Sequence, residues 1–324
     1  MADDRRFEIN AYMDGMSLAS ALKRLLPDRS WSQVKRLIAT RRVCINGTLC
    51  LDEARRLTAG DRVEVFEHSR RPLPSATNVR VVHQDDHILV VDKPAGIVTV
   101  RRPEERGWPA RRKAMQPTLD ELVRELLSES DAARQPAGRA KTPWLRAAHR
   151  LDRDTSGLAL FALSPAAQLA MVRMFAKREI ERAYLAVVHG HPRTQTIETW
   201  LVRDRGDGLR GSSPRGAQAT GGKQAVTHLR PVERIGDLSL VECRLETGRT
   251  HQIRIHLCEI GHVLCGEKVY THRLGEPPRP DASGAPRQAL HSAELRFAHP
   301  VTGKGMEFSS PLPADLAGWL RTVC

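Results

Sequence analysis

The chain has 324 residues, 40% of them hydrophobic, and its 51 Lys and Arg outnumber its 38 Asp and Glu to give a formal net charge of +13. This composition supports a sizeable core in about two domains, and it excludes a wholly disordered or fibrous chain. No apolar run reaches the ~18–20 residues of a membrane span. The first ten residues also lack the apolar middle of a secretory signal, so we expect a cytoplasmic protein that does not associate with a membrane.

The basic excess consists mainly of arginine, since only nine of the 51 basic residues are lysines and 42 are arginines. A guanidinium group grips phosphate with two hydrogen bonds and stacks on bases, so an arginine excess favours a polyanionic partner. A codon bias would explain the choice of arginine over lysine but not the net charge. The composition therefore predicts a nucleic-acid-binding protein.

The six cysteines show no Cys-x-x-Cys pair and no zinc-finger spacing. Cys258 and Cys265 flank His256 and His262, which would allow a metal site. We prefer to interpret the cysteines as small hydrophobic residues, present as reduced thiols in a cytoplasm. No metal site is predicted.

Residues 17–68 have the pattern of a small α+β domain that follows an N-terminal extension over residues 1–16. Leucines recur at helical spacing over 18–26, and apolar residues do so again over 31–38 after a capping serine. Two short strands are predicted next, at 41–46 before an Asn-Gly turn and at 60–66.

Four basic residues gather on the second predicted helix and the strand after it: Lys35, Arg36, Arg41 and Arg42. Such a cluster is often only a solvated helix face. Here the order of elements resembles the alpha-L RNA-binding domain, which occurs in a ribosomal protein and in several RNA-modifying enzymes. The resemblance implies that these four residues bind RNA.

A linker over 69–78 separates this domain from a large α+β domain over 79–324, in which short strands outnumber helices and a mixed or antiparallel sheet is expected. Two strands meet at residues 84–87 and end in a Lys-Pro-x-Gly turn. The other expected elements are a mobile basic loop at 101–116, an amphipathic helix at 118–127, an irregular stretch at 128–142 and an exposed loop at 203–222.

Two stretches are richer in functional residue types than a core requires. Five of the six residues from 149 to 154 are ionisable, and a strand-like apolar run follows them directly. The second stretch, 245–257, places Arg249 and His251 among other polar residues of a predicted helix. A neighbouring arginine would favour the ionised form of Asp152, which would then act as acceptor or nucleophile rather than acid. The sequence contains no nucleophile elbow, phosphate-binding loop or dinucleotide fingerprint.

The stretch HRLDRDTSGL at 149–158 closely resembles the signature of the RluA-type pseudouridine synthases. Five more segments resemble that family's other motifs in the same order: DKPAG at 92–96, ERAYLAVVHG at 181–190, LETGRTHQIRIH at 245–256, and the closing strands at 290–300 and 311–313. The resemblance spans about residues 79–315. The small domain in front resembles the arrangement in members that act on large-subunit ribosomal RNA.

The resemblance implies isomerisation of uridine to pseudouridine within RNA, a redox-neutral reaction that needs no cofactor. It makes Asp152 the catalytic aspartate, Arg254 its partner, and Tyr184 the residue that stacks on the target uracil and helps remove its ring proton. Arg150 would fill the gap left by the extruded uridine. The other residues expected around the substrate are His149, Arg153, Arg249 and His251, and for His251, as for Lys93, architecture is the favoured role.

Some points stay open. The chain has Glu267 where the family commonly has aspartate, which changes a turn, and Arg182 where it has lysine. The insertion at 101–116 would change which RNA is bound. Whether Asp152 bonds to the sugar or abstracts a sugar proton is undecided. The alternatives are the same chemistry on transfer RNA, a non-catalytic ribosome-assembly factor, and a hydrolase using a metal or a histidine pair. RNA is the expected partner, with no obligate protein partner.

Overall fold

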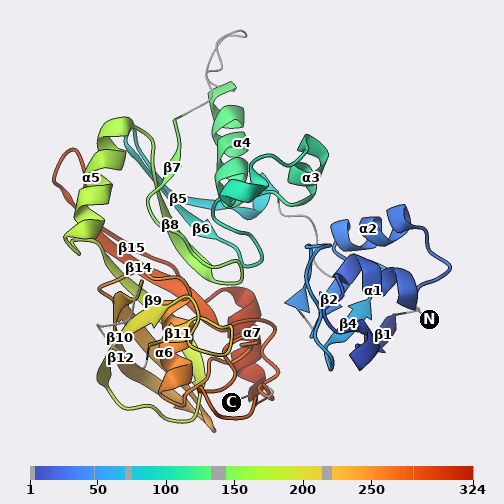
Figure 1. Ribbon diagram of the computed structural model, residues 1–324. Helices are drawn as coiled ribbons and strands as arrows, with labels where there is room; N and C mark the ends of the chain where they lie inside the picture. Colours follow the sequence, from blue (N-terminus) through green and yellow to red (C-terminus); the bar gives the residue numbers. More distant parts are fainter. Residues whose placement is uncertain are drawn as a thin grey trace. The chain divides into compact units, whose positions relative to one another are not determined.

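The computed structural model describes residues 4–46, 48–69, 75–132, 144–213, 221–279 and 281–323 (Figure 1). The chain divides into two compact units. The first is Met1–Pro74 with Glu104–Pro117, and the second is Ser75–Pro103 with Thr118–Cys324. In the part of the chain that the structure describes, no helix is both long and apolar enough to cross a membrane.

The first unit packs two helices on a small sheet of strand order β1-β4-β2-β3. Its elements are β1 (Arg5–Glu8), η1 (Ala11–Met13), α1 (Leu18–Leu25), α2 (Trp31–Ala39), β2 (Val43–Ile45), β3 (Thr48–Leu49) and β4 (Arg62–Val65). Ser17 and Ser30 cap the two helices, and Gln33 completes a capping box at Ser30. The predicted helices and strands of this region are therefore present. Gly47, in the predicted turn, lies outside the described residues.

The N-terminal segment, which we expected to precede the small domain, contributes strand β1 to it. Its four residues pair antiparallel with β4, and Phe7 packs against the core formed by the helices and the sheet. A strand of four residues with two arginines has no clear alternation to reveal it in the sequence. The extension is thus an edge strand of the first unit.

The basic insertion differs from the mobile loop that we predicted. It contains η3 (Pro103–Glu105) and helix α3 (Ala110–Met115), and residues 104–117 belong to the first unit. Gln116 Nε2 donates to the Leu51 carbonyl oxygen at 3.3 Å. Alanine, arginine, lysine and methionine are good helix formers, which explains the helix after Pro109. Of the predicted linker, residues 70–74 lie outside the described residues, and η2 (Ala76–Asn78) follows them.

The second unit is built on a mixed sheet, as predicted. Its described strands follow the order β11-β10-β12-β13-β9-β14-β8-β6-β5, with β15 beside β14 and β7 beside β8. Among the strand pairs that the structure describes, β8 and β14 form the only parallel one. The strands are β5 (Arg80–Gln84), β6 (Ile88–Lys93), β7 (Arg146–Ala147), β8 (Ser156–Ala162), β9 (Glu181–His189), β10 (Gln195–Val202), β11 (Gly211–Ser212), β12 (Lys223–Ile235), β13 (Leu238–Leu245), β14 (Leu290–Ala298) and β15 (Gly305–Ser309).

Helices cover both faces of this sheet, which explains why every residue of β8 is buried. The helices are α4 (Leu119–Ala132), α5 (Pro165–Ala176), α6 (Gln252–Glu259) and α7 (Ala314–Val323). Phe161 and Tyr184 point to the face where α4 and α6 pack, whereas Leu158 and Leu160 point to the face of α5. The alternation along β8 and β9 thus places the Tyr184 ring on the α6 side.

Three element boundaries differ from the predictions. Helix α4 runs on to Ala132, into the stretch that we expected to be irregular, and residues 133–142 of that stretch lie outside the described part. Strand β11 interrupts the loop expected at 203–222, of which 214–220 lie outside it too. Helix α6 begins at Gln252 rather than directly after Gly248, because His251 adopts a left-handed backbone with φ of 60°.

Candidate active site

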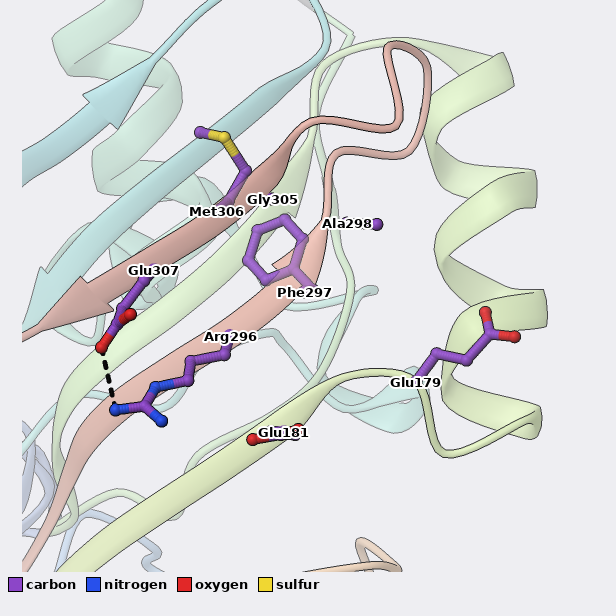
Figure 2. A pocket seen from close by; sticks show the side chains of 8 residues that line it. All are labelled: Glu179, Glu181, Arg296, Phe297, Ala298, Gly305, Met306 and Glu307. Carbon is purple, nitrogen blue, oxygen red and sulfur yellow. Dashed lines mark ion pairs between the residues drawn. The ribbon is translucent and has the colours of Figure 1, made fainter.

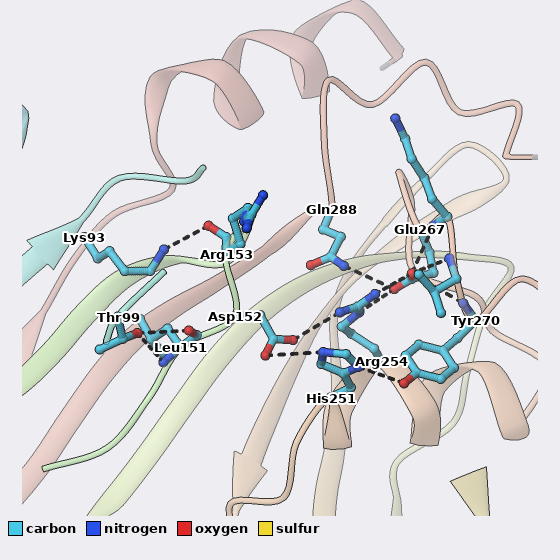
Figure 3. A network of polar contacts seen from close by, with 12 residues as sticks. Lys93, Thr99, Leu151, Asp152, Arg153, His251, Arg254, Glu267, Tyr270 and Gln288 are labelled. Atoms are coloured by element: carbon cyan, nitrogen blue, oxygen red, sulfur yellow. Dashed lines mark hydrogen bonds and ion pairs between the residues drawn. The ribbon is translucent and has the colours of Figure 1, made fainter. Parts of the chain in front are cut away.

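Asp152 lies in the loop between β7 and β8, and the backbone on both sides of it is fixed by the turn after β6 (Figure 3). Thr99 Oγ1 donates to the Leu151 carbonyl oxygen and accepts from the Leu151 amide, both at 2.9 Å. The Arg153 carbonyl oxygen accepts from Lys93 Nζ at 3.0 Å and from the Gly96 amide at 2.7 Å. The position of the carboxylate is therefore set by its neighbours' main chain.

Lys93 is fully buried below this loop. Its ammonium donates to three carbonyl oxygens: besides that of Arg153, those of Pro94 at 3.1 Å and Ile97 at 2.9 Å. Burial lowers the pKa of Lys93 to about 7, although the nearby Asp154 and Asp152 oppose that shift. A side chain enclosed in this way acts as a tie between two loops and does not reach a substrate.

Arg254, on α6, lies between two carboxylates (Figure 3). Its Nη1 donates to Asp152 Oδ2 at 3.2 Å, and its Nε and Nη2 donate to Glu267 at 2.7 Å each. Burial alone would lower the pKa of Arg254, but the hydrogen bonds with Glu267 and Asp152 raise it above its ordinary value. The guanidinium therefore stays charged and presents one edge to Asp152.

The Glu267 side chain has no exposed surface, and it is ionised by its surroundings. Burial would raise the pKa of Glu267, but the Arg254 hydrogen bonds and the amides of Lys268 and Val269, each 2.9 Å away, lower it overall. Gln288 Nε2 lies 3.5 Å from the same carboxylate. Glu267 thus fixes the guanidinium on the side away from Asp152.

His251 faces the second oxygen of Asp152, with Nε2 3.9 Å from Oδ1. Its Nδ1 lies 2.7 Å from the Tyr270 hydroxyl, and burial lowers the pKa of His251. The Asp152 side chain keeps 27% of its surface exposed. The result is a carboxylate that is anchored on one side by a cation and open on the other.

Tyr184, on β9, is 5% exposed and belongs to the same apolar cluster as Leu151 and Ile253. Those two residues precede Asp152 and Arg254 directly in the chain, so the cluster joins the three predicted catalytic positions. Burial raises the pKa of the Tyr184 hydroxyl, and the proximity of Asp152 adds to this shift. The phenol is therefore protonated at neutral pH.

Two family profiles match the chain. That of the RNA pseudouridylate synthases covers residues 87–259, and that of the S4 domain covers residues 16–63. The chain belongs to the RNA pseudouridylate synthase family. It is an isomerase of uridine in RNA, and its N-terminal S4 domain is of the RNA-binding type that the order of helices and strands predicted.

Relatives of this synthase match along nearly all of its length. A Nitrosomonas europaea protein named ribosomal large subunit pseudouridine synthase D is 33% identical over 321 residues, which cover 95% of this chain and 85% of the relative. A Zymomonas mobilis protein of the same name is 34% identical and covers 94% and 92%. The solved structure of human RNA pseudouridylate synthase domain containing 1 is 26% identical, with a TM-score of 0.55 over 77% of this chain and 90% of that one.

The other residues predicted near the substrate of the synthase have mixed placements. Arg150, Arg153 and Arg249 are exposed, and Arg249 Nε donates to the Gln224 carbonyl oxygen at 2.9 Å. The His149 ring instead packs against Phe175 and accepts the Leu160 amide at 3.1 Å through Nε2. Burial lowers the pKa of His149 to about 3, so a neutral ring supports β8. This placement argues against direct substrate contact by His149.

The predicted RNA-binding residues of the S4 domain do not all face solvent. Lys35 and Arg36 are exposed on α2, where Lys35 lies 3.6 Å from Glu53. Arg42 is half-buried, with its Nε 2.6 Å from the Phe66 carbonyl oxygen. Arg41 is only 4% exposed and has φ of 65°, so the tight turn after α2 directs it inward. Its prediction as an RNA contact disagrees with this burial.

Sequence reasoning missed the supports of the site. Glu267 was interpreted as a turn residue, although it is the main partner of Arg254. Thr99 was not singled out, and neither was Arg287, whose Nη1 donates to the Asp154 carbonyl oxygen at 3.0 Å. The one sequence signal for Glu267 was the Gly-Glu pair at 266–267, which departs from the family pattern. It marked the position but did not reveal that Glu267 pairs with Arg254.

A hollow of about 420 Å³ lies elsewhere on the synthase, over β14 and β15 (Figure 2). Its lining includes Glu179, Glu181 and Glu307 but only one basic residue, Arg296, which pairs with Glu307 at 2.8 Å. An acidic lining repels the phosphates of RNA. None of its lining residues belongs to the Asp152 network, so this hollow is not the uridine site.

Proposed function

We propose that this synthase converts uridines of large-subunit ribosomal RNA to pseudouridine, with Asp152 as the catalytic carboxylate. The observation that carries the role of Asp152 is its ion pair with Arg254 at 3.2 Å, on a loop held by Lys93 and Thr99. The names of the bacterial relatives and the leading S4 domain support ribosomal over transfer RNA as the substrate. A cytoplasmic location follows from this substrate.

The chemistry needs an anion at the ribose. The bond from C1′ to ring N1 breaks, the uracil turns over, and C1′ bonds to C5; the C5 proton is lost and N1 gains one, so the product is an isomer. Asp152 assists departure of the base either by bonding to C1′ or by taking a proton from the sugar. The Arg254 guanidinium holds the carboxylate in place for either route.

The target uridine has to leave its helix to reach Asp152, because a base inside a stack is not accessible to a side chain in a protein loop. The exposed guanidinium of Arg150, two residues before Asp152, is suited to fill the vacancy by stacking. Tyr184 forms an apolar wall for the uracil ring. Arg153, Arg249 and His251 then lie around the substrate, and Lys35, Arg36 and Arg42 contact RNA phosphates.

The decisive experiment compares Asp152→Asn with the wild-type protein on transcripts of large-subunit ribosomal RNA and of transfer RNA. The amide keeps the shape of the side chain but lacks its charge, so modification should be lost while RNA affinity stays within about twofold. Asp237→Asn, on the exposed turn between β12 and β13, is the matched control and should remain active. Turnover by Asp152→Asn would show that Asp152 is not the catalytic carboxylate.

The substrate class is tested separately, by mapping pseudouridines in all cellular RNAs of a strain that lacks the gene. Loss of sites in large-subunit ribosomal RNA is the expected result. Loss confined to transfer RNA would overturn the proposed substrate and leave the chemistry intact, whereas no lost site anywhere would favour a non-catalytic assembly factor.

A further inference from the structure

Three side chains that have no part in the Asp152 network meet on the second unit. His189 ends β9, Cys265 precedes the Gly266–Glu267 turn, and Asp281 lies in the loop before β14. His189 Nε2 is 2.8 Å from Asp281 Oδ1. One nitrogen, the thiol sulfur and one carboxylate oxygen all lie within 4.8 Å of one another.

Zinc binds all three of these donor types. Zn²⁺ binds thiolate at about 2.3 Å and imidazole or carboxylate at about 2.0–2.2 Å in a tetrahedral arrangement. Tetrahedral ligand atoms at those bond lengths lie about 3.3–3.6 Å apart, so the three atoms need to move only by tenths of an ångström to about an ångström to enclose the ion. A thiolate with an imidazole also selects against Mg²⁺ and Ca²⁺, which prefer oxygen ligands.

We propose that His189, Cys265 and Asp281 form a zinc site with three protein ligands and a fourth position open to water. Part of the His189 and Asp281 side chains is exposed, at 36% and 16%, so an ion can enter from solvent. Cys265 is fully buried and lies at the bottom of the site. The proposal does not depend on which RNA the synthase modifies.

The surroundings already support two of the three ligands, as hydrogen bonds do in metal sites. Asp281 accepts from Ser283 Oγ at 3.0 Å. The Cys265 amide donates to the Val187 carbonyl oxygen, and the Cys265 carbonyl oxygen accepts from the Ala289 amide, both at 2.9 Å. Cys265 is thus tied through its main chain to both β9 and the start of β14.

The site lies on the segment that carries Glu267. Gly266, between Cys265 and Glu267, has φ of 74°, and a Cβ there would lie 2.0 Å from the Arg287 carbonyl oxygen. The backbone between Cys265 and Glu267 therefore lies directly against that of Arg287. A zinc ion held by Cys265 and Asp281 would join Asp281 to the segment that carries Glu267, the residue that fixes Arg254.

The sequence pattern pointed to different histidines. His256 and His262 lie close to Cys258 and Cys265 along the chain, but His256 hydrogen-bonds to Thr199 and Thr227, and His262 Nδ1 lies 2.9 Å from the His189 carbonyl oxygen. The ligands that meet in space come from three distant segments, which explains why spacing along the chain did not reveal them.

The test uses the full chain without a histidine tag, because a tag would bind metal itself. Zinc content and Co²⁺ substitution are measured on the wild type and on three variants, Cys265→Ser, His189→Gln and Asp281→Asn. We expect one equivalent of metal in the wild type and, with Co²⁺, a thiolate-to-metal charge-transfer band and the strong visible bands of a tetrahedral ion. Each variant should bind Co²⁺ at least tenfold more weakly.

Cys243→Ser and Cys258→Ser are the matched controls, since each removes another buried thiol from the same unit. Both should keep the charge-transfer band. Zinc should also raise the melting temperature of the wild type but not that of Asp281→Asn, a loop variant that is expected to fold. Absence of a thiolate band in the wild type would overturn the proposal, and so would loss of the band in Cys258→Ser but not in Cys265→Ser.

Discussion

Glu267 accepts two hydrogen bonds of 2.7 Å from Arg254, and the same guanidinium reaches Asp152 at 3.2 Å. The buried carboxylate holds the guanidinium by two parallel contacts, which set its plane as well as its position. Asp152 receives the one edge that remains. The geometry of the proposed catalytic ion pair is therefore determined by a residue that does not face the substrate.

Glu267→Gln should impair both stability and catalysis. Removing one partner of a buried ion pair costs about 3–5 kcal/mol when the other charge is left alone. Arg254 keeps Asp152 as a second partner, so the loss in free energy of unfolding should lie at or below the lower end of that range. Arg254 would then turn towards Asp152 and lose its fixed plane, so the single-turnover rate should fall at least tenfold. Urea denaturation measures the free energy of unfolding, and rapid-quench assays on saturating RNA measure the rate.

Glu267→Asp is the informative control for that prediction. It keeps the negative charge but is one methylene shorter, so it should unfold less readily than Glu267→Gln and retain more activity. A glutamine variant as active as the wild type would show that Asp152 and Arg254 are positioned without Glu267.

Lys93 should make the free energy of unfolding depend on pH, and the substitution Lys93→Met should remove that dependence. Burial lowers the pKa of Lys93 from 10.5 to about 7. Between these values the unfolded chain binds up to one more proton than the native chain, so the free energy of unfolding rises with pH. Below pH 7 the amine is charged in both states, and the whole cost of burying that charge then lowers the stability of the native chain. The slope from this group is at most about 1.4 kcal/mol per pH unit.

Lys93→Met removes that titration and leaves three carbonyl oxygens without their donor. The difference in unfolding free energy between wild type and variant should therefore widen as the pH rises from 7 to 9, measured by urea titrations at several pH values. Parallel pH profiles for the two proteins would show that Lys93 keeps its proton throughout this range.

The order of motifs indicated which distant residues meet. A ten-residue signature and a later helix segment implied that Asp152 and Arg254 are neighbours, and the structure brings them to 3.2 Å. The two helices of the S4 domain were equally predictable, because serine caps and leucine spacing are local signals. Their physical origin lies within a few residues of chain, which a single sequence displays directly.

Partnerships that join distant segments were not visible in the sequence. Glu267 is a good example, because its burial depends on α6 and on the turn after Cys265 meeting in space. Arg41 is another, since a basic residue among other basic residues gives no sign that a left-handed turn directs it inward. The insertion at 101–116 was misjudged for a related reason, as its helix is short and its contact with the first unit is tertiary.

Tyr184→Phe should separate two roles of the tyrosine. The Tyr184 pKa is raised by burial, so the hydroxyl is protonated at neutral pH and is not a ready base. If the ring mainly packs against the uracil, the phenylalanine variant should lose no more than about tenfold in single-turnover rate, with an unchanged pH profile. A general base contributes about 10²–10⁴-fold, so a loss of that size would assign proton removal to Tyr184.

The insertion should contribute to RNA affinity but not to chemistry. Its Arg106 and Arg111 are exposed, and its residues 104–117 belong to the same unit as the S4 domain. Arg106→Ala with Arg111→Ala should weaken RNA binding and reduce the slope of log affinity against log salt by about one for each lost phosphate contact. Glu104→Ala, an exposed acidic position of the same insertion, serves as control and should leave affinity unchanged or improve it.

Because Asp152 is untouched in the double variant, its single-turnover rate at saturating RNA should stay at the wild-type level. Unchanged affinity and salt slope in the double variant would show that the insertion makes no contact with RNA.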